Sequence, residues 1–505
     1  MKIELLDTTL RDGEQTSGVS FTPSEKLSIA QNLLTELNIS RIEIASARVS
    51  SGEFESVKGI CEWAQRAGFI NRVEILGFID NGKSIKWVSD VGGKVINLLA
   101  KGSLRHCREQ LGKSPEAHFA DIANEVKNAN AAGLTVNLYL EDWSNGIKYS
   151  PDYVFNMVDT LKELPIKRFM LPDTLGVFNP NQVYGYGKKM TDRYPDIHFD
   201  FHGHNDYDLA TSNSFAAALV GFKGLHCTIN GLGERAGNAP LSSVVAVVHD
   251  MLRLETGIDE KKINKVSRFV EAFSGVIIPQ NEPVIGENVF TQCAGVHADG
   301  DKKDNLYCNA LLPERFGRER EYALGKTSGK ANVRNNLEAL GIELSESDIK
   351  KVTERVIQLG DKKEIVTQFE LPYIVSDVLK HDSSHSKVNV INYALSLSHG
   401  LRPTATVKIE INGKEYQQSA AGDGQYDAFM KAIKRIYNDL LDRKFPMLTN
   451  YIVNIPPGGR TDALVQTTIS WDYNGHQIKT RGVDADQTEA AIQATVKMLN
   501  IIENL

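Results

Sequence analysis

Eight short apolar runs alternate with amphipathic stretches over about the first 280 residues, and this alternation constrains the fold more than any other feature. The stretches between the runs carry helical periodicity, as in 23–37, 115–132 and 180–193. Eight strands that each precede a helix favour a parallel (β/α)8 TIM barrel, and an open sheet with fewer strands is the alternative. The predicted strands are Ile3–Thr8, Arg41–Ala45, Arg72–Phe78, Val95–Leu99, Thr135–Leu140, Arg168–Leu171, His198–His202 and Gly224–Asn230.

Polar, reactive side chains gather where these predicted strands end. The carboxyl ends of parallel strands meet at one face of a barrel, and barrel active sites lie on that face, so we expect one site there. The side chains are Arg11 and Asp12 after the first strand, Ser46 and Arg48 after the second, Glu141 and Asp142 after the fifth, Asp173 and Thr174 after the sixth, His202 and His204 after the seventh, and Glu234 and Asn238 after the eighth.

The His202-Gly203-His204 segment points to a metal site. Two imidazoles two residues apart on an extended segment project to the same side. With Asp12 they form a set suited to Zn²⁺ or Mn²⁺, with Mg²⁺ as a third option, and they leave open positions for a substrate. Asn238 would be a weak fourth ligand or an outer support. Two structural histidines with satisfied hydrogen bonds would give the same pattern.

Composition narrows the class of protein. The net charge of −7 argues against nucleic acid or an anionic membrane as the main partner. The five cysteines are scattered and form no Cys-x-x-Cys pair, which suits a reducing compartment. The N-terminus lacks the features of a signal peptide, and no apolar run is long enough to span a bilayer. We therefore expect a cytoplasmic protein.

The length of 505 residues predicts more than one domain. We expect a TIM-barrel catalytic domain over 1–282 and connector subdomains over 283–380. Within the connector, periodicity is lost over about 285–325, a short helical segment follows, and 380–386 is typical of a hinge. Residues 388–505 form an α+β regulatory domain with an internal repeat.

The repeat is visible in the turn and cap signals of the last 120 or so residues. A hairpin turn at Asn412-Gly413 is followed by a strand and a helix over Ala428–Asn438. The same order returns from Asn474-Gly475 to a helix over Glu489–Asn500. Two similar strand-strand-helix units predict a pseudo-twofold domain, and such domains can bind a small effector where repeats or subunits meet.

Three motifs carry a resemblance to a known family. LDTTLRDGEQ (6–15), HGHND (202–206) and NGLGERAGN (230–238) together resemble the 2-isopropylmalate, homocitrate and citramalate synthases, and the resemblance extends over the whole chain. It implies condensation of acetyl-CoA with a 2-oxo acid, followed by thioester hydrolysis that releases CoA. It also implies a homodimer in which the connector of one chain reaches the active site of the other.

The resemblance assigns further roles. His297 matches the candidate base for the acetyl methyl group, and Glu141 matches a carboxylate that assists in proton transfer or thioester hydrolysis. Arg11 would stabilise the developing alkoxide, with a strand-end salt bridge as the alternative, and Thr174 would donate to the substrate carboxylate. Acetyl-CoA contacts are implied for Phe78, Asp299, Asn305, Leu306 and Tyr307.

The identity of the 2-oxo acid depends on the volume of its pocket. Leu76, Leu99 and Tyr139 match the pocket positions and make a small apolar cup that favours pyruvate, whose condensation product is citramalate. Tyr139 could instead simply pack in the barrel. Residues 44–50 also depart from the Gly-Phe-Pro pattern common in isopropylmalate synthases and look like citramalate synthases of the isoleucine pathway. An open cup would favour 2-oxoisovalerate, the substrate of 2-isopropylmalate synthases.

The resemblance also implies an effector site in the repeat domain. Isoleucine is the expected inhibitor if citramalate is the product, and Ala485 departs from a proline in close relatives. A metal-dependent retro-aldolase or lyase and a catalytically silent amino-acid sensor are the competing functions. The implied effector residues are Tyr426, Asp427, Leu448, Tyr451, Ile455, Val465, Ala485 and Gln487.

Overall fold

The structure is a computed structural model that describes residues 2–301, 303, 305–361, 366–379, 387–454, 465–474 and 476–504. The chain forms two compact units, one made of 1–290 with 308–319 and the other of 291–307 with 320–505. Among the described residues, no helix combines the length and the apolar composition needed to cross a bilayer.

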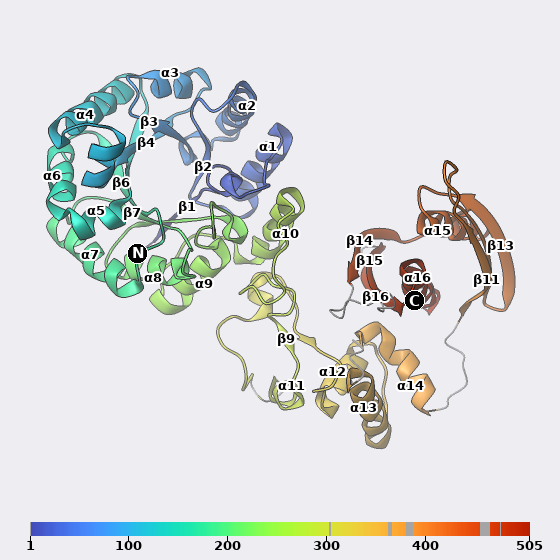
Figure 1. Cartoon of the computed structure of the whole chain (residues 1–505). Coiled ribbons are helices and arrows are strands. Elements are labelled where there is room, and N and C mark those ends of the chain that lie inside the picture. The colour runs from blue at the N-terminus through green and yellow to red at the C-terminus, as the bar shows by residue number, and fades with distance from the viewer. Residues whose placement is uncertain are drawn as a thin grey trace. The chain divides into compact units, whose positions relative to one another are not determined.

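The first unit is a closed barrel in which β1 to β8 follow one another in sequence order and run parallel (Figure 1). The barrel closes where β8 pairs with β1, with Glu4 opposite Gly224. The predicted TIM barrel is therefore confirmed. The strands are β1 Glu4–Asp7, β2 Arg41–Ser46, β3 Val73–Phe78, β4 Val95–Lys101, β5 Thr135–Glu141, β6 Ile166–Asp173, β7 Phe199–Gly203 and β8 Gly224–Cys227.

The largest difference from a predicted strand boundary is at the end of the eighth strand. The eighth was expected to reach Asn230, but it ends at Cys227, and Ile229–Gly231 form a short 3-10 turn. Asn230 has a φ of 57°, a left-handed conformation that a strand does not contain. The polar residues that follow β8 therefore leave the sheet in a tight loop.

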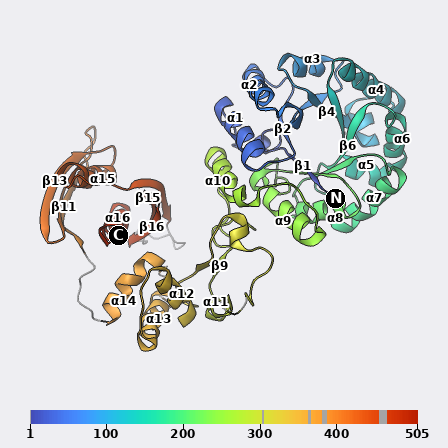
Figure 2. The ribbon, with the colours of Figure 1, turned by 180° about the vertical axis from the view of Figure 1, so that it is seen from behind.

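A ring of helices surrounds the strands, as Figure 2 shows from behind. Local signals explain several of the starts: Thr22 and Asn179 each form a capping box at the N-terminus of a helix that begins with proline. The helices are α1 Pro23–Gln31, α2 Ser51–Ala67, α3 Lys83–Asp90, α4 Pro115–Ala131, α5 Trp143–Tyr149, α6 Pro151–Leu161, α7 Pro180–Arg193, α8 Ala210–Leu219, α9 Leu241–Leu252 and α10 Ile263–Ser274.

Alternate strand residues fill the barrel interior in layers. Near the amino ends of the strands the interior is polar, with an ion-paired and hydrogen-bonded set that we call the lower layer. Closer to the carboxyl ends lies an apolar cluster of Leu6, Leu76, Tyr139 and Met170, against which Leu99 packs. The lower layer consists of Glu4, Arg41, Glu74, Asn97, Asn137, Arg168 and Asp200.

The second unit contains residues 291–307 and the part of the connector from 320 onward, and the connector is more regular than predicted. Residues 285–325 were expected to lack periodic structure, yet they contain α11 (Gly295–Asp301) and a two-stranded sheet of β9 (Thr291–Gln292) and β10 (Glu321–Tyr322). Glycine has a packing role here, because a Cβ on Gly295 would lie 2.6 Å from the Cα of Gly329. Three helices follow, α12 Lys330–Ala339, α13 Glu346–Asp361 and α14 Leu371–Leu379.

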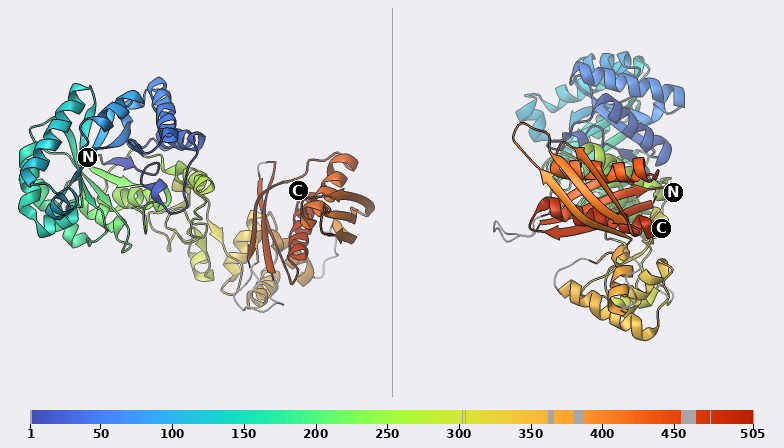
Figure 3. Two further views of the ribbon diagram at one scale, coloured as in Figure 1. Left: turned by 45° about the horizontal axis from the view of Figure 1, so that its top comes forward. Right: turned by 90° about the vertical axis from the view of Figure 1, so that its right-hand side faces the viewer.

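The C-terminal part contains two three-stranded sheets and two helices that lie between them (Figure 3). The predicted repeat is present, but each copy of the repeat has three strands before its helix rather than two. In β11, the first strand, apolar residues alternate toward the core, but a bulge between Val390 and Asn392 breaks the regular alternation. The units are β11 Val388–Ser396, β12 Thr404–Ile411, β13 Lys414–Ala421 and α15 Gln425–Arg435, then β14 Met447–Asn454, β15 Val465–Tyr473, β16 His476–Asp484 and α16 Gln487–Asn504. The predicted hinge at 380–386 lies outside the described residues.

Candidate active site

Asp12, His202 and His204 lie together at the carboxyl ends of the barrel strands. All three are buried, and their ligand atoms lie within 4.8 Å of one another. The Nε2 atoms of His202 and His204 are 3.3 Å apart and lie 3.2 and 3.7 Å from Oδ2 of Asp12. β7 supplies the first imidazole and its continuation the second, two residues later. A tight turn after β1 brings in Asp12, because its backbone N–H donates to the carbonyl of Thr8 at 2.8 Å.

This set fits a divalent metal ion. Two imidazole nitrogens and a carboxylate oxygen facing one point match the ligands of Zn²⁺ or Mn²⁺. Asn238 pairs with His204 as an isolated backbone bridge, and its Nδ2 donates to the carbonyl of Leu232 at 3.0 Å. Its buried Oδ1 has no partner among the described residues, so it is available as a fourth oxygen ligand.

Arg11 gives the site a fixed positive charge. Its Nε donates to Glu43 at 2.6 Å, and its Nη1 lies 3.2 Å from Asp12. Burial would raise the pKa of Asp12, but the charge of Arg11 and the nearby imidazoles hold it well below its usual value. Burial lowers the pKa of His202, and burial with repulsion from His202 lowers the pKa of His204 to about 4. Near neutral pH the site therefore presents a carboxylate and two neutral imidazoles.

The predicted substrate cup forms one cluster inside the barrel. Leu76 and Tyr139 are 5% and 2% exposed, and Leu99 packs against them. The ring of Tyr139 lies edge-on to that of His202, with 6.3 Å between centroids. Thr174, after β6, accepts a hydrogen bond from the backbone N–H of Asp142 at 2.9 Å. Its hydroxyl proton is thereby left to donate elsewhere.

Glu141 and Phe78 lie at the ends of neighbouring barrel strands. Glu141 ends β5 and forms an ion pair with Lys101 at the end of β4. Phe78 ends β3, and its backbone N–H donates to Ser84 Oγ. The Phe78 side chain is 36% exposed, which leaves it accessible to a ligand at this face.

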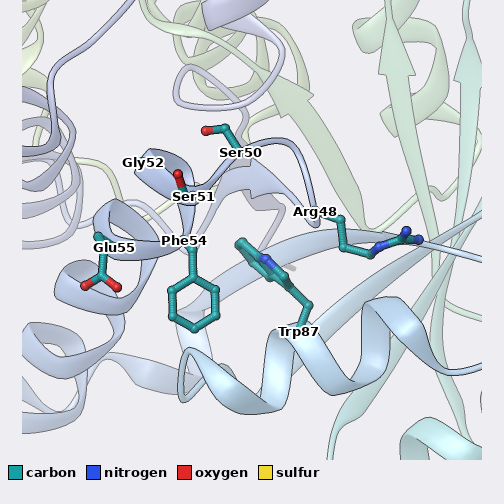
Figure 4. Close-up of a pocket in the computed structure, with 7 residues that line it drawn as sticks. All are labelled: Arg48, Ser50, Ser51, Gly52, Phe54, Glu55 and Trp87. Carbon is teal, nitrogen blue, oxygen red and sulfur yellow. The ribbon is translucent and has the colours of Figure 1, made fainter.

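A pocket of about 560 Å³ opens on the loop after β2. Figure 4 shows the Trp87 indole between Arg48 and Phe54. Phe54 and Trp87 meet edge-on at 5.5 Å, and Arg48 pairs with Asp80 at 2.7 Å. Arg48, one of the predicted strand-end polar residues, therefore lines this pocket. Ser50, Ser51, Gly52 and Glu55 complete the lining.

The residues predicted to bind acetyl-CoA from the connector lie close together in the second unit. His297 is in α11, and its ring lies 4.5 Å from that of Tyr307. Asp299 pairs with Lys303, and Asn305 accepts a hydrogen bond from Arg320. The side chains of Leu306 and Tyr307 are exposed.

The predicted effector residues are only partly gathered. Tyr426 and Tyr451 have ring centroids 5.5 Å apart, and the Tyr426 hydroxyl lies 2.7 Å from that of Thr495. Asp427 is engaged by Lys431 and by the backbone N–H of Asp423. Leu448 is exposed on β14, Val465 is buried at the start of β15, Ala485 and Gln487 are exposed near the start of α16, and Ile455 lies outside the described residues.

Sequence reasoning missed four side chains that hold the predicted ones. Glu43 binds Arg11, Lys101 binds Glu141, and His226 lies 3.1 Å from the Tyr139 hydroxyl. Asp200 in turn lies 3.2 Å from His226. Glu43 and Asp200 lie inside apolar runs, at the alternate positions that face the interior. Polar residues at inward strand positions were the signal that could have identified them.

Comparison with known families shows to which family the chain belongs. Residues 2–270, more than half of its length, match the HMGL-like family. The chain belongs to that family. Further along the chain, residues 284–364 match the homocitrate synthase post-HMGL domain-like family, and residues 365–503 match the LeuA allosteric (dimerisation) domain. This combination of domains identifies the protein as a condensing synthase with a dimerisation domain.

Full-length relatives of this HMGL-like chain carry two names. A probable 2-isopropylmalate synthase of Methanopyrus kandleri is 33% identical, with 99% of this chain and 98% of the relative covered. The (R)-citramalate synthase of Methanocaldococcus jannaschii is 31% identical with both chains covered completely. The 2-isopropylmalate synthase of the same organism is 32% identical, over 99% and 95%. Overall identity therefore does not discriminate between the two activities.

Proposed function

We propose that the protein is an acyltransferase that condenses acetyl-CoA and pyruvate with water to give (R)-citramalate and CoA. Such a reaction opens the pyruvate route to isoleucine. The observation that carries the choice of pyruvate is the packed apolar cluster of Leu76, Leu99 and Tyr139 beside the metal-binding set. Pyruvate offers only a methyl group to a cup of this kind.

A small apolar cup discriminates mainly by excluding larger substrates. One methylene gained or lost in a pocket changes binding by only about 1–3 kcal/mol, whereas a clash with a rigid wall excludes more strongly. Tyr139 is a rigid wall because its ring and its hydroxyl are both held by contacts inside the barrel. The branched side chain of 2-oxoisovalerate would need that wall to move.

The barrel residues supply the electrostatics of the condensation. Asp12, His202, His204 and the Asn238 oxygen would hold a divalent ion, which when bound polarises the ketone of the 2-oxo acid. Arg11 would stabilise the alkoxide that forms as the ketone is attacked, because Glu43 fixes its guanidinium beside this point. The Thr174 hydroxyl would donate to the substrate carboxylate.

The proton chemistry falls to His297 and Glu141. His297 would remove a proton from the acetyl methyl group, and the resulting carbon nucleophile would form the new bond to the ketone carbon. The alkoxide then takes up a proton. Water attacks the thioester carbonyl, the carbon–sulfur bond breaks, and CoA leaves as its thiol. Glu141, held by Lys101, would assist in one of these proton transfers.

Two chains are proposed to complete each active site. The connector residues Asp299, Asn305, Leu306 and Tyr307 would bind acetyl-CoA together with Phe78 of the partner barrel. Exposed apolar side chains at Leu306 and Tyr307 support a ligand-binding role for this segment. The LeuA dimerisation domain supports a homodimer.

Isoleucine is the proposed feedback inhibitor. The paired rings of Tyr426 and Tyr451 would contact its aliphatic side chain, and Asp427 its amino group. Leucine takes that place in the second candidate, a 2-isopropylmalate synthase, a name that two relatives at 33% and 32% identity carry.

Thiol release tests the proposal. The protein, with Mn²⁺ or Zn²⁺ and acetyl-CoA, would be given pyruvate, 2-oxoisovalerate or 2-oxoglutarate, each with and without isoleucine or leucine. Release that requires pyruvate and falls with isoleucine is expected, and acetyl-CoA without an acid is the control. A preference for 2-oxoisovalerate with inhibition by leucine establishes the second candidate. If none of the three acids supports CoA release, both candidates fail and a lyase or a sensor remains.

A further inference from the structure

A chain of buried hydrogen bonds runs from the lower layer of the barrel to the substrate cup. Asp200 on β7 lies 3.2 Å from His226 Nε2, and His226 Nδ1 lies 3.1 Å from the Tyr139 hydroxyl on β5. All three side chains are buried, with exposures of 2% or less. None of the predicted site residues except Tyr139 takes part in this chain.

The chemistry of the three groups fixes the direction of the hydrogen bonds. Asp200 is ion-paired with Arg41 and lies 2.9 Å from His198, so it is a carboxylate that only accepts. Nε2 of His226 therefore carries the ring proton, and its Nδ1 is left as an acceptor. The Tyr139 hydroxyl donates to that nitrogen. Its proton is thus directed toward Nδ1 of His226.

The location of Tyr139 makes this hydrogen bond matter. Its ring lies edge-on to the imidazoles of His226 and His202, with centroid distances of 5.5 and 6.3 Å, and those two imidazoles are 5.4 Å apart. The same ring packs with Leu76 and Met170 in the apolar cluster of the cup. A phenol held at its hydroxyl cannot swing away from the cup, whereas one held only by packing can change rotamer.

We propose that His226, oriented by Asp200, is a positioning residue that anchors the Tyr139 hydroxyl and thereby sets the size of the 2-oxo acid that the cup accepts. This inference rests on the proposed condensation of acetyl-CoA with a 2-oxo acid. It extends the determinants of specificity from the wall of the cup to a residue behind it.

Three variants test the inference in the full-length protein, with pyruvate and 2-oxobutanoate as probes. His226→Leu removes the acceptor, and Asp200 keeps Arg41 and His198 as partners. The ratio of kcat/KM for pyruvate to that for 2-oxobutanoate should fall about three- to tenfold, the size expected for loss of one buried hydrogen bond. The loss should be in KM for pyruvate more than in kcat. Tyr139→Phe should give the same shift.

His226→Asn is the conservative control. Its side-chain oxygen can occupy the place of Nδ1, so the ratio should return to within about twofold of the wild type, which packing alone does not predict. In the Tyr139→Phe background, His226→Leu should produce no further shift, because the hydroxyl that it acts through is gone.

Two outcomes overturn the inference. One is a wild-type ratio in His226→Leu when thermal unfolding and metal content show an intact protein. The other is an equal shift in the presence and absence of the Tyr139 hydroxyl. If the wild type turns over no 2-oxo acid at all, the proposed function fails instead. If His226→Leu does not fold, the comparison of Tyr139→Phe and His226→Asn decides, since the first should shift the ratio and the second should not.

Discussion

The barrel holds two groups of buried polar side chains, and they differ in how their charges are matched. In the lower layer, Arg41 contacts Glu74 and Asp200, and Arg168 contacts Glu4. At the mouth, two imidazole nitrogens converge on a carboxylate oxygen that Arg11 also contacts, and the other oxygens of this set, Asp12 Oδ1 and Asn238 Oδ1, have no hydrogen-bond partner among the described residues.

This difference indicates that the lower layer has a structural role and that the group at the mouth binds a ligand. A buried charge with an opposite charge in contact is already stabilised, so the lower layer needs nothing more from outside. Convergent lone pairs without a donor are costly unless a cation binds between them. The same residue types thus form the framework of the barrel at one end and a ligand site at the other. Each group predicts its own response to substitution.

Removal of Arg41 should have the largest effect, and it should be on stability. Arg41→Met leaves Glu74 and Asp200 buried without a cation, which typically costs about 3–5 kcal/mol. Urea unfolding of the wild type and variant measures this loss. Lys86→Met, which breaks an exposed ion pair with Asp90, is the control and should barely change the unfolding midpoint. Equal midpoints for Arg41→Met and the wild type would contradict the structural role of the lower layer.

Substitution of Asp12 should act on activity instead. Asp12→Asn removes one charged ligand and one partner of Arg11, so kcat/KM should fall about 100- to 1000-fold, with a matching loss of bound divalent metal. Thiol release and elemental analysis of the dialysed protein measure the two effects. Asp90→Asn on the surface of α3 is the matched control. If the Asp12 variant retains activity within tenfold of the wild type, this group is not the metal site.

The two groups also differ in how far the sequence predicts them. Asp12 and His204 follow strands and His202 lies near the end of β7, where a polar residue interrupts an apolar pattern and is easily noticed. Arg41, Glu74 and Asp200 lie within strands, and their partners are on strands that are distant in the chain, so only the closed barrel brings them together. His226 was not predicted for the same reason, because its contact with Tyr139 joins β8 to β5.

For the fold, too, features with a local sequence pattern were predicted and features that depend on distant contacts were not. Each barrel strand alternates with a helix, so local periodicity predicted all eight. The first strand of each C-terminal unit was missed. In β11 a bulge between Val390 and Asn392 interrupts the apolar alternation, so the strand is hard to recognise from its own pattern. Connector helix α11 was missed because its glycines resemble a loop, although Gly295 and Gly329 are needed for close packing.

The smallest expected effect concerns a third kind of buried polar group, a histidine with one satisfied nitrogen. Nε2 of His118 on α4 accepts a hydrogen bond from the backbone N–H of Lys101 at 3.2 Å, so the imidazole is neutral. Burial, with the charge of Lys113, lowers its pKa from 6.5 to about 4. The unfolded chain binds this proton more readily, so stability is complete above about pH 6.5 and declines as the pH falls toward 4.

His118→Gln should remove this acid sensitivity, since the amide oxygen can accept the same hydrogen bond without titrating. Between pH 7 and pH 5 the wild type should lose about 2 kcal/mol more than the variant in urea unfolding. His399→Gln, at an exposed position, should keep the pH dependence of the wild type. Parallel curves for the wild type and His118→Gln would mean that His118 is already protonated in the fold. A satisfied nitrogen would then be no guide to a structural histidine, and the contrast with His202 and His204 would have to rest on geometry alone.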